Sequence, residues 1–246
     1  MQKEKIEILG VRFDNVNLQE AALKAIKLAK GNSKTYITTP NPEIVLKAIK
    51  NPIFLEVLNN SALNIPDGTG ILLASRYLSK QKVLKERVTG IDLMLEICKR
   101  SGYENLKIFL LGASESAGKK AKQHLEEKYP NIKIVGRLSK SPRAEDEKEI
   151  IETINHSNAD ILFVAFGAPK QELWISRNLQ KLTSVKLAIG VGGAFDFIAG
   201  IKKRAPKIFR KLGLEWLIRF IQEPKRIKRI YNATIRFPYE IIRRKK

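Results

Sequence analysis

Short β-rich runs that alternate with loops and helical segments constrain the fold of this chain more than any other feature. Most of the runs end in a loop that contains glycine or proline, and a helical pattern follows. Continuous apolar runs of this kind are buried on both faces, so the alternation predicts an α/β fold with a mostly parallel sheet between helices. The runs are KTYITT (34–39), SALNI (61–65), KIFLLG (107–112), IKIVG (132–136), ADILFVAFG (159–167) and VKLAIGVGG (185–193).

The predicted sheet also indicates where a ligand would bind. Open parallel sheets bind ligands at the carboxyl ends of their strands, and the loops there are predicted to converge on one crevice. Gly112–Ala113 and Gly192–Gly193 each precede a possible helix, which suits a backbone close to phosphate or ribose, although such turns can also serve only as connections. The polar and glycine residues expected at the crevice are Thr39, Asn41, Asp67, Gly112, Ala113, Gly136, Gly167, Gln171, Gly192, Gly193 and Asp196.

Several common cofactor and metal motifs are absent from the sequence. It contains neither G-x-G-x-x-G nor G-x-x-x-x-G-K-[ST], the usual dinucleotide and P-loop fingerprints. It also lacks a D-x-D pair of the kind that holds a divalent metal on a nucleotide diphosphate. One cysteine, Cys98, and two histidines, His124 and His156, argue against a disulfide or a zinc site. We therefore expect no cofactor and no metal, and arginine or lysine would neutralise any bound diphosphate.

The formal net charge of +21 predicts an anionic partner. Nucleic acid, lipid headgroups and a phosphorylated substrate all satisfy that requirement. The composition, 43% hydrophobic and 29% charged, is that of a globular protein. The chain shows no signal-peptide pattern and no apolar run long enough to span a bilayer, which favours a cytoplasmic location.

The charge is concentrated in residues 201–246, which we call the appendage. They hold 16 Lys and Arg against three acidic residues, whereas residues 1–200, the predicted catalytic core, are only mildly basic. Apolar residues recur through the appendage at helical spacing, with Trp216 and Phe220 four residues apart. A basic amphipathic helix with aromatic residues predicts binding to a membrane surface. The alternatives are a helix packed on its own domain with a solvated basic face, and a nucleic-acid-binding segment.

The stretch LNIPDGTGI (63–71) places Asp67 between an apolar run and a helical pattern. An aspartate at such a turn often does nothing more than cap the helix that follows. The same carboxylate, standing at the predicted crevice, could also act as a general base. The residue pattern alone leaves both interpretations open.

A series of longer motifs identifies a family. The motifs are TTPNPEIV, NIPDGTGI, ERVTGIDL, FGAPKQELW, GVGGAFDFIAG and KRAPKIFRKLGLEWLIRFIQEPKR, in this order over about residues 5–232. With them the chain resembles the WecG/TagA/CpsF glycosyltransferases, and most closely the TagA type. The final segment, YNATIRFPYEIIRRKK, matches no motif of the family that we can assign, and its basic end could simply add lipid affinity.

The resemblance implies a Rossmann-like core and an inverting glycosyl transfer. The expected donor is UDP-N-acetylmannosamine, and the expected acceptor is N-acetylglucosamine on undecaprenyl diphosphate. The product, ManNAc-β-1,4-GlcNAc, begins the linkage unit of wall teichoic acid. The resemblance further implies that the appendage docks on the inner face of the cell membrane and completes the active site. A homo-oligomer in solution and an active membrane-bound monomer are expected.

The resemblance also assigns residues to roles. It makes Asp67 the general base, and it places Thr39, Arg87 and Gln171 in the substrate pocket. Three appendage arginines, Arg219, Arg226 and Arg229, are implied to take part in catalysis, where they could neutralise the UDP leaving group. Arg87 and Gln171 could instead form ordinary surface pairs.

Other functions remain open at this stage. A basic nucleic-acid-binding α/β protein or RNA methyltransferase would explain the charge and the LLGAS loop, but not the apolar residues interleaved in the appendage. A non-catalytic membrane-binding module would leave the polar loops at the sheet without a purpose. Within the family, a donor such as UDP-ManNAcA or UDP-glucose is an alternative, because no residue decides the sugar.

Overall fold

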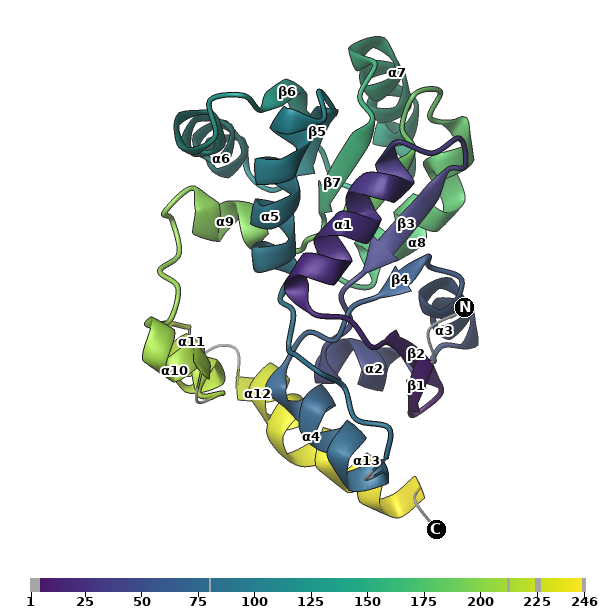
Figure 1. Cartoon of the computed structure of the whole chain (residues 1–246), viewed down its shortest axis with the longest axis vertical. Coiled ribbons are helices and arrows are strands. Elements are labelled where there is room, and N and C mark those ends of the chain that lie inside the picture. The colour runs from purple at the N-terminus through teal and green to yellow at the C-terminus, as the bar shows by residue number, and fades with distance from the viewer. Residues whose placement is uncertain (1–4, 80, 212, 224–226, 245–246) are drawn as a thin grey trace.

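The computed structural model describes residues 5–79, 81–211, 213–223 and 227–244. Within them, a parallel sheet has the strand order β4–β3–β8–β7–β5–β6 (Figure 1). This arrangement confirms the predicted α/β fold with its parallel sheet, and the predicted runs contain all of these strands, apart from a short extension of β6. The bounds are β3 (Thr35–Thr38), β4 (Leu63–Asn64), β5 (Lys107–Gly112), β6 (Lys133–Leu138), β7 (Ile161–Ala165) and β8 (Leu187–Gly190).

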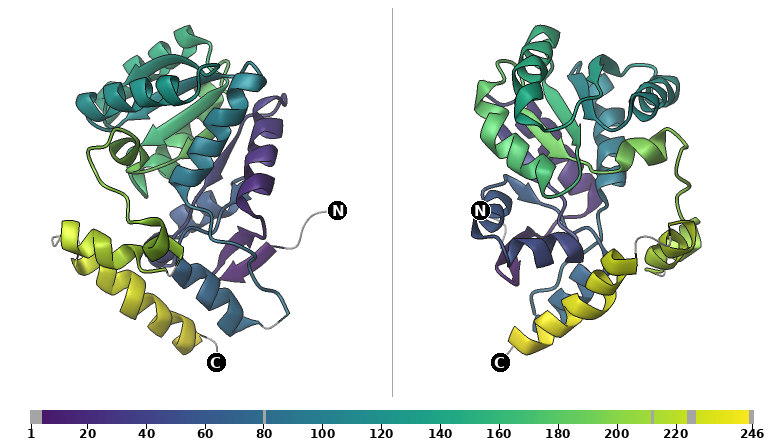
Figure 2. Two further views of the ribbon diagram at one scale, coloured as in Figure 1. Left: turned by 60° about the vertical axis from the view of Figure 1, so that its left-hand side comes forward. Right: turned by 180° about the vertical axis from the view of Figure 1, so that it is seen from behind.

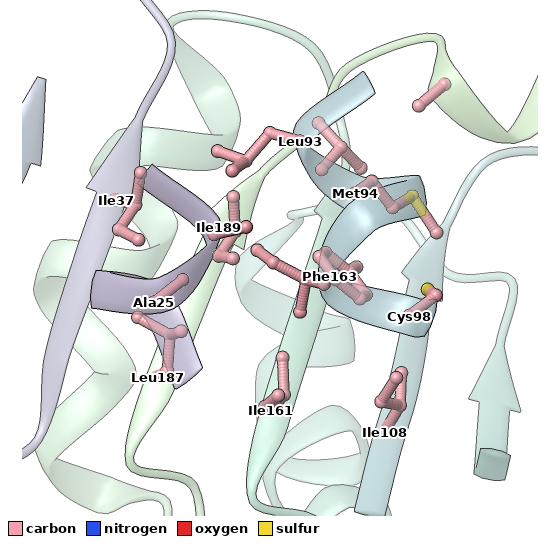
Figure 3. Close-up of a cluster of buried hydrophobic side chains, with 14 of the residues drawn as sticks. Ala25, Ile37, Leu93, Met94, Cys98, Ile108, Ile161, Phe163, Leu187 and Ile189 are labelled. Atoms are coloured by element: carbon pink, nitrogen blue, oxygen red, sulfur yellow. The ribbon is translucent and has the colours of Figure 1, made fainter. Parts of the chain in front are cut away.

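Helices cover both faces of the sheet, as continuous apolar strands require. In β7, Ile161 and Phe163 point to one face, and Leu162 and Val164 point to the other. The first face packs against α1 (Leu18–Ala29), α5 (Gly90–Tyr103), α6 (Glu115–Lys128) and α9 (Ala194–Ile198), and Figure 3 shows part of this cluster. The second face packs against α7 (Glu147–Ser157), α8 (Lys170–Asn178) and η2 (Leu179–Lys181), with η1 (Ala144–Asp146) before α7.

A third apolar cluster lies beside the β4 edge of the sheet. It joins the antiparallel hairpin of β1 (Lys5–Ile8) and β2 (Val11–Asp14) to α2 (Pro42–Ala48), α3 (Pro52–Asn59) and α4 (Thr69–Leu78). Leu9 and Gly10 form the hairpin turn, both with positive φ, as a tight two-residue turn demands. We did not predict this hairpin, because its strands are short.

The appendage is helical, as its spacing predicts. Its elements are α10 (Lys207–Lys211), α11 (Glu215–Gln222), α12 (Ile227–Tyr231), the π-helical turn η4 (Asn232–Arg236) and α13 (Phe237–Arg244). α12, η4 and α13 run as one rod alongside α4 (Figure 2). Phe237 and Ile241, 1% and 3% exposed, enter the third apolar cluster beside Ile71. Residues 237–244, which belong to the final segment that we could not assign from sequence, are therefore packed against the rest of the protein.

None of the helices in the described ranges is both long and apolar enough to cross a bilayer.

Candidate active site

Two cavities adjoin at the carboxyl ends of β3, β4, β7 and β8. The sheet-end cavity, of about 160 Å³, lies between the loops that follow these strands, with Thr39, Gly90 and Gln171 among its walls. The appendage cavity, of about 380 Å³, lies between α4 and the appendage, with Arg87 and Trp216 among its walls. The two cavities share four lining residues: Asn41, Glu43, Asp67 and Arg229.

Asp67 stands at the junction of the two cavities. Its backbone N–H donates to the carbonyl of Pro40 (3.1 Å), which ties the β4 loop to the β3 loop. Its Oδ2 accepts from the N–H of Gly90, the first residue of α5, at 3.4 Å. The N-cap residue of α4 is Gly68, whose φ of 116° suits glycine. Asp67 is therefore not the N-cap residue of α4, and the hydrogen bond of its Oδ2 leads to α5 instead.

Thr39 and Asn41 reach the same place from the end of β3. Thr39 is buried and lines the sheet-end cavity, where a Cβ on Gly90 would stand 3.2 Å from its hydroxyl. Asn41 caps α2, because its Oδ1 accepts from the N–H of Ile44 at 3.0 Å. Its amide nitrogen has no partner among the described residues. Asn41 can therefore cap a helix and donate to a ligand at the same time.

Gln171 ties the two loops that flank the sheet-end cavity. Its Oε1 accepts from the N–H groups of Gly167 and Gly192, each at 3.0 Å, and the residue is only 3% exposed. Its amide group passes over Gly190, where a Cβ would stand 2.6 Å from Nε2. The alternative of a surface pair is therefore excluded for Gln171. The N–H of Gly192, which we expected to face phosphate, is occupied by this side chain.

Glu172 holds the other end of the Gln171 amide. Its Oε1 accepts from Nε2 of Gln171 at 2.8 Å, and its Oε2 is buried without a hydrogen-bond partner among the described residues. Burial raises the pKa of Glu172 to about 7, because removal from water penalises the charged carboxylate. We did not predict a role for Glu172 from the sequence, although it belongs to the FGAPKQELW motif.

Of the four arginines expected at the site, two line the cavities and the side chains of the other two are outside the described part of the structure. Arg87 lines the appendage cavity and forms a salt bridge with Glu215 (3.3 Å). Arg229 lines both cavities and pairs with Glu43, Nε to Oε2, at 2.6 Å. Arg219 belongs to α11, but its side chain is outside the described part of the structure, as is the whole of Arg226.

Four of the expected substrate-binding residues lie outside both cavities. Gly112 and Ala113 follow β5, where a Cβ on Gly112 would meet Phe166 at 2.9 Å, so this glycine permits close packing. Gly136 lies within β6, and a Cβ there would meet the ring of Phe109 at 2.5 Å. Asp196 pairs with Lys202 (3.1 Å), and Lys202 itself lines the sheet-end cavity. A direct role for these four residues stays a prediction.

Two lysines line the sheet-end cavity without having been predicted. Lys47 donates to the carbonyl of Ala168 (3.1 Å) and pairs with Glu43 (2.8 Å). Lys202 enters from the first turn of the appendage. Together with Arg229, they bring three cations to one small polar cavity, an arrangement that suits an anionic ligand such as a diphosphate. In a chain with 46 lysines and arginines, residue type could not have indicated these two.

Glu43 organises the charges at the junction. Burial raises the pKa of this carboxyl, but hydrogen bonds and charges from Lys47 and Arg229 outweigh it, so the pKa is lowered overall. Within the described residues, no three His, Cys, Asp or Glu side chains gather as a metal site would require. The site thus offers a carboxylate, Asp67, between a cationic cavity and a larger cavity whose walls include Leu73, Trp216 and Ile230.

The sequence profile described as the glycosyl transferase WecG/TagA/CpsF family matches residues 6–246. It extends past residue 232, where our own motif match stopped, and includes α13. The N-acetylglucosaminyldiphosphoundecaprenol N-acetyl-beta-D-mannosaminyltransferase of Staphylococcus aureus strain MRSA252 is 38% identical over 244 residues, which cover 98% of this chain and 94% of that protein. The proteins of the same name from strains MW2 and NCTC 8325 are 37% identical with the same coverage.

Proposed function

The chain belongs to the WecG/TagA/CpsF family of glycosyltransferases, and on that premise we propose that it is an N-acetyl-β-D-mannosaminyltransferase. Its acceptor is N-acetylglucosaminyldiphosphoundecaprenol, as in the names of the relatives, and its donor is UDP-N-acetylmannosamine. The disaccharide lipid that it makes is the start of a wall teichoic acid linkage unit.

The observation that carries this proposal is the position of Asp67 between two cavities of different character. A glycosyl transfer from a nucleotide to a lipid needs two binding spaces that meet at one reacting atom. The sheet-end cavity holds cations and suits the diphosphate of a donor, whereas the larger appendage cavity suits a lipid-linked sugar. Asp67 lines both, so one carboxylate can reach the point where the two substrates meet.

The chemistry is a single displacement at the anomeric carbon. As the acceptor hydroxyl attacks, its oxygen forms the new bond to that carbon and its proton passes to the carboxylate of Asp67. The bond from the anomeric carbon to the donor phosphate breaks, and UDP leaves with the electron pair. Attack from the face opposite the leaving group inverts the anomeric configuration.

Positive side chains support the departure of UDP. Lys47, Lys202 and Arg229 line the sheet-end cavity, where they can neutralise the charge that develops on the leaving diphosphate. Arg219 and Arg226 are proposed to join them on the strength of the family resemblance. Because these cations replace a divalent metal, we expect transfer to persist in EDTA, and restoration of a lost activity by Mg²⁺ or Mn²⁺ would contradict that expectation.

The appendage is proposed to bind the inner face of the membrane. α12, η4 and α13 expose Ile227, Tyr231, Ile235 and Tyr239, each four residues from the next and more than half exposed. Four-residue spacing places these side chains along one side of a helical rod, and lysine and arginine flank them. Such a surface suits an anionic bilayer. A homo-oligomer in solution that covers this surface, and a membrane-bound active monomer, stay predictions.

Transfer assays with a panel of donors test the proposal. The purified chain is incubated with a short-chain prenyl-diphosphate N-acetylglucosamine and, separately, with UDP-N-acetylmannosamine, UDP-ManNAcA and UDP-glucose. We expect the N-acetylmannosaminyl product, with the β configuration by NMR. If product formed only from UDP-ManNAcA or UDP-glucose, that nucleotide sugar would be the donor in place of UDP-N-acetylmannosamine. If no donor gave a product, the proposed transferase activity would be refuted. RNA filter binding at two salt concentrations tests the nucleic-acid alternative.

A further inference from the structure

A third cavity, of about 570 Å³, lies between α4, the segment with Glu86 and Arg87, and Arg210 of α10. It is lined by Thr69, Leu72, Leu73, Arg76, Glu86, Arg87 and Arg210. Three arginines from three separate segments therefore converge on one concave surface, with a single acidic side chain among them. We call this space the arginine cavity.

The arginine cavity adjoins the appendage cavity. Thr69, Leu73 and Arg87 line both of them. The appendage closes tightly over this wall, because a Cβ on Gly213 would stand 2.8 Å from Oγ1 of Thr69. Arg87 therefore lies between the cavity that contains Asp67 and the cavity that contains Arg76 and Arg210.

Two of the three arginines are available to a ligand. Neither Arg76 nor Arg210 forms a salt bridge in the described part of the chain, and Nε of Arg210 is buried without a hydrogen-bond partner. Arg87 already pairs with Glu215, and Oε2 of Glu86 accepts from the N–H of Leu18 (3.2 Å). The buried Nε–H of Arg210, which lacks a partner among the described residues, costs free energy that an anion would recover, whereas Arg76 is exposed and can reach a ligand.

The surface next to these arginines is apolar. Leu73 and Tyr77 are 56% and 48% exposed on α4, and they lie three residues before and one residue after Arg76. Residues three and four apart share a helix face, so Leu73, Arg76 and Tyr77 form one mixed surface at the mouth of the cavity. Such a surface suits a molecule with an anionic group followed directly by a hydrocarbon chain.

We propose that Arg76, Arg87 and Arg210 bind the diphosphate of the lipid-linked acceptor. This assignment rests on the proposed function, in which the acceptor carries one sugar between its reacting hydroxyl and its diphosphate. The base and the diphosphate site must then lie close together, and the appendage cavity, which Asp67 lines, shares Thr69, Leu73 and Arg87 with the arginine cavity. The prenyl chain leaves over Leu73 and Tyr77.

Steady-state kinetics with separately varied substrates test the assignment. Arg76→Gln and Arg210→Gln are each expected to raise the KM for a detergent-solubilised prenyl-diphosphate N-acetylglucosamine about tenfold, the effect of one lost charge-assisted hydrogen bond. The KM for the UDP-sugar is expected to stay unchanged. Arg143→Gln, which removes an exposed arginine outside all three cavities, serves as the matched control. An unchanged acceptor KM, or an equal rise in the KM for the UDP-sugar, overturns the proposal.

A binding measurement separates this site from the proposed function and from lipid headgroups. Farnesyl diphosphate, but not farnesol, is expected to bind the wild-type chain and to lose affinity in the Arg76→Gln, Arg210→Gln double variant. Farnesyl diphosphate binding does not depend on sugar transfer. If the chain showed this binding but no transfer activity, the diphosphate site would be supported and the proposed transferase function would be refuted. Sedimentation with phosphatidylglycerol vesicles is expected to be the same for the double variant and for Arg143→Gln. A selective loss of vesicle binding with unchanged farnesyl diphosphate affinity would assign the arginines to headgroups and overturn the proposal.

Discussion

The central sheet and the appendage are held in place by different forces. In the sheet, side chains such as Phe163 and Leu187 are completely buried between helices, and apolar burial dominates. Among the described residues, several ion pairs join the appendage to the core, including Arg204 with Asp92 (2.8 Å) and Arg229 with Glu43 (2.6 Å). Apolar anchoring of the appendage is concentrated at Phe237 and Ile241.

This difference explains why the walls of the two cavities are held in place to different degrees. The sheet-end cavity lies between loops that the sheet fixes, and Gln171 locks two of these loops together. The appendage cavity exists only while the appendage is docked, since Trp216 and Ile230 form part of its wall. The donor site, to which the appendage contributes only Lys202 and Arg229, should therefore depend less on docking than the acceptor site, which should depend on salt, on membrane contact and on the last helix.

Removal of the appendage should have the largest effect on function. A chain truncated after Gly200 is expected to lose transfer and binding to anionic vesicles, because it loses one wall of the appendage cavity and most of the positive charge. UDP-sugar binding, measured by calorimetry, should weaken without being abolished, since most walls of the sheet-end cavity precede residue 201 but Lys202 and Arg229 are removed. Full-rate transfer by the truncated core to a soluble acceptor would reduce the appendage to an anchor.

A single change within the appendage supplies the control for truncation. Arg219→Ala removes one of its 16 basic residues, so vesicle binding should be retained while most turnover is lost. Retained turnover in Arg219→Ala would contradict a catalytic role for this arginine.

The Asp67→Asn substitution should have the next largest effect on turnover, and it tests the residue at the junction of the two cavities. The amide keeps the shape of the side chain but cannot take a proton, so kcat should fall by about 10²-fold or more, the usual effect of losing a general base. Binding of the UDP-sugar should change little. Turnover near that of the wild type would leave Asp67 as a positioning residue that holds the N-terminus of α5.

The pH dependence of the free energy of unfolding tests the environment of the buried carboxyl group of Glu172. The folded state raises the pKa of this carboxyl from 4.5 to about 7, so folding favours the protonated form. The contribution of Glu172 to stability is then greatest below pH 4.5 and falls as pH rises towards 7, because the unfolded state releases its proton first. The decrease is on the order of 3 kcal/mol. Urea unfolding between pH 4.5 and 7.5 should show this slope, and Glu172→Gln should lose it while remaining folded.

The smallest effect is expected for an exposed ion pair between the appendage and the core. Arg229 is about half exposed, so a double-mutant cycle of Arg229→Gln and Glu43→Gln should give a coupling free energy of about 0.2–1 kcal/mol. The coupling should weaken as salt is raised. A much larger coupling, insensitive to salt, would mean that ion pairs hold the appendage as firmly as apolar burial holds the core.

The parallel sheet and the loops at the ends of its strands could be predicted from local sequence patterns. Strands β5, β7 and β8 fall within the predicted apolar runs, and the loops with Thr39, Asp67 and Gln171 converge as the geometry of a parallel sheet requires. These features depend on local apolar patterning and on motifs only a few residues long, so they can be predicted before the chain is folded.

Contacts between side chains that are distant in the sequence became known only from the tertiary structure. The sequence did not indicate that Gln171 occupies the N–H of Gly192, that Arg229 pairs with Glu43, or that Phe237 packs into the same cluster as Ile71. Each of these contacts joins segments separated in the chain, and residue type alone cannot choose one partner among 46 basic and 25 acidic side chains. Gly136 illustrates the same limit, because its place in the edge strand β6 packs it against Phe109 rather than beside the cavities. Long-range packing selects such contacts, and the local pattern carries no information about it.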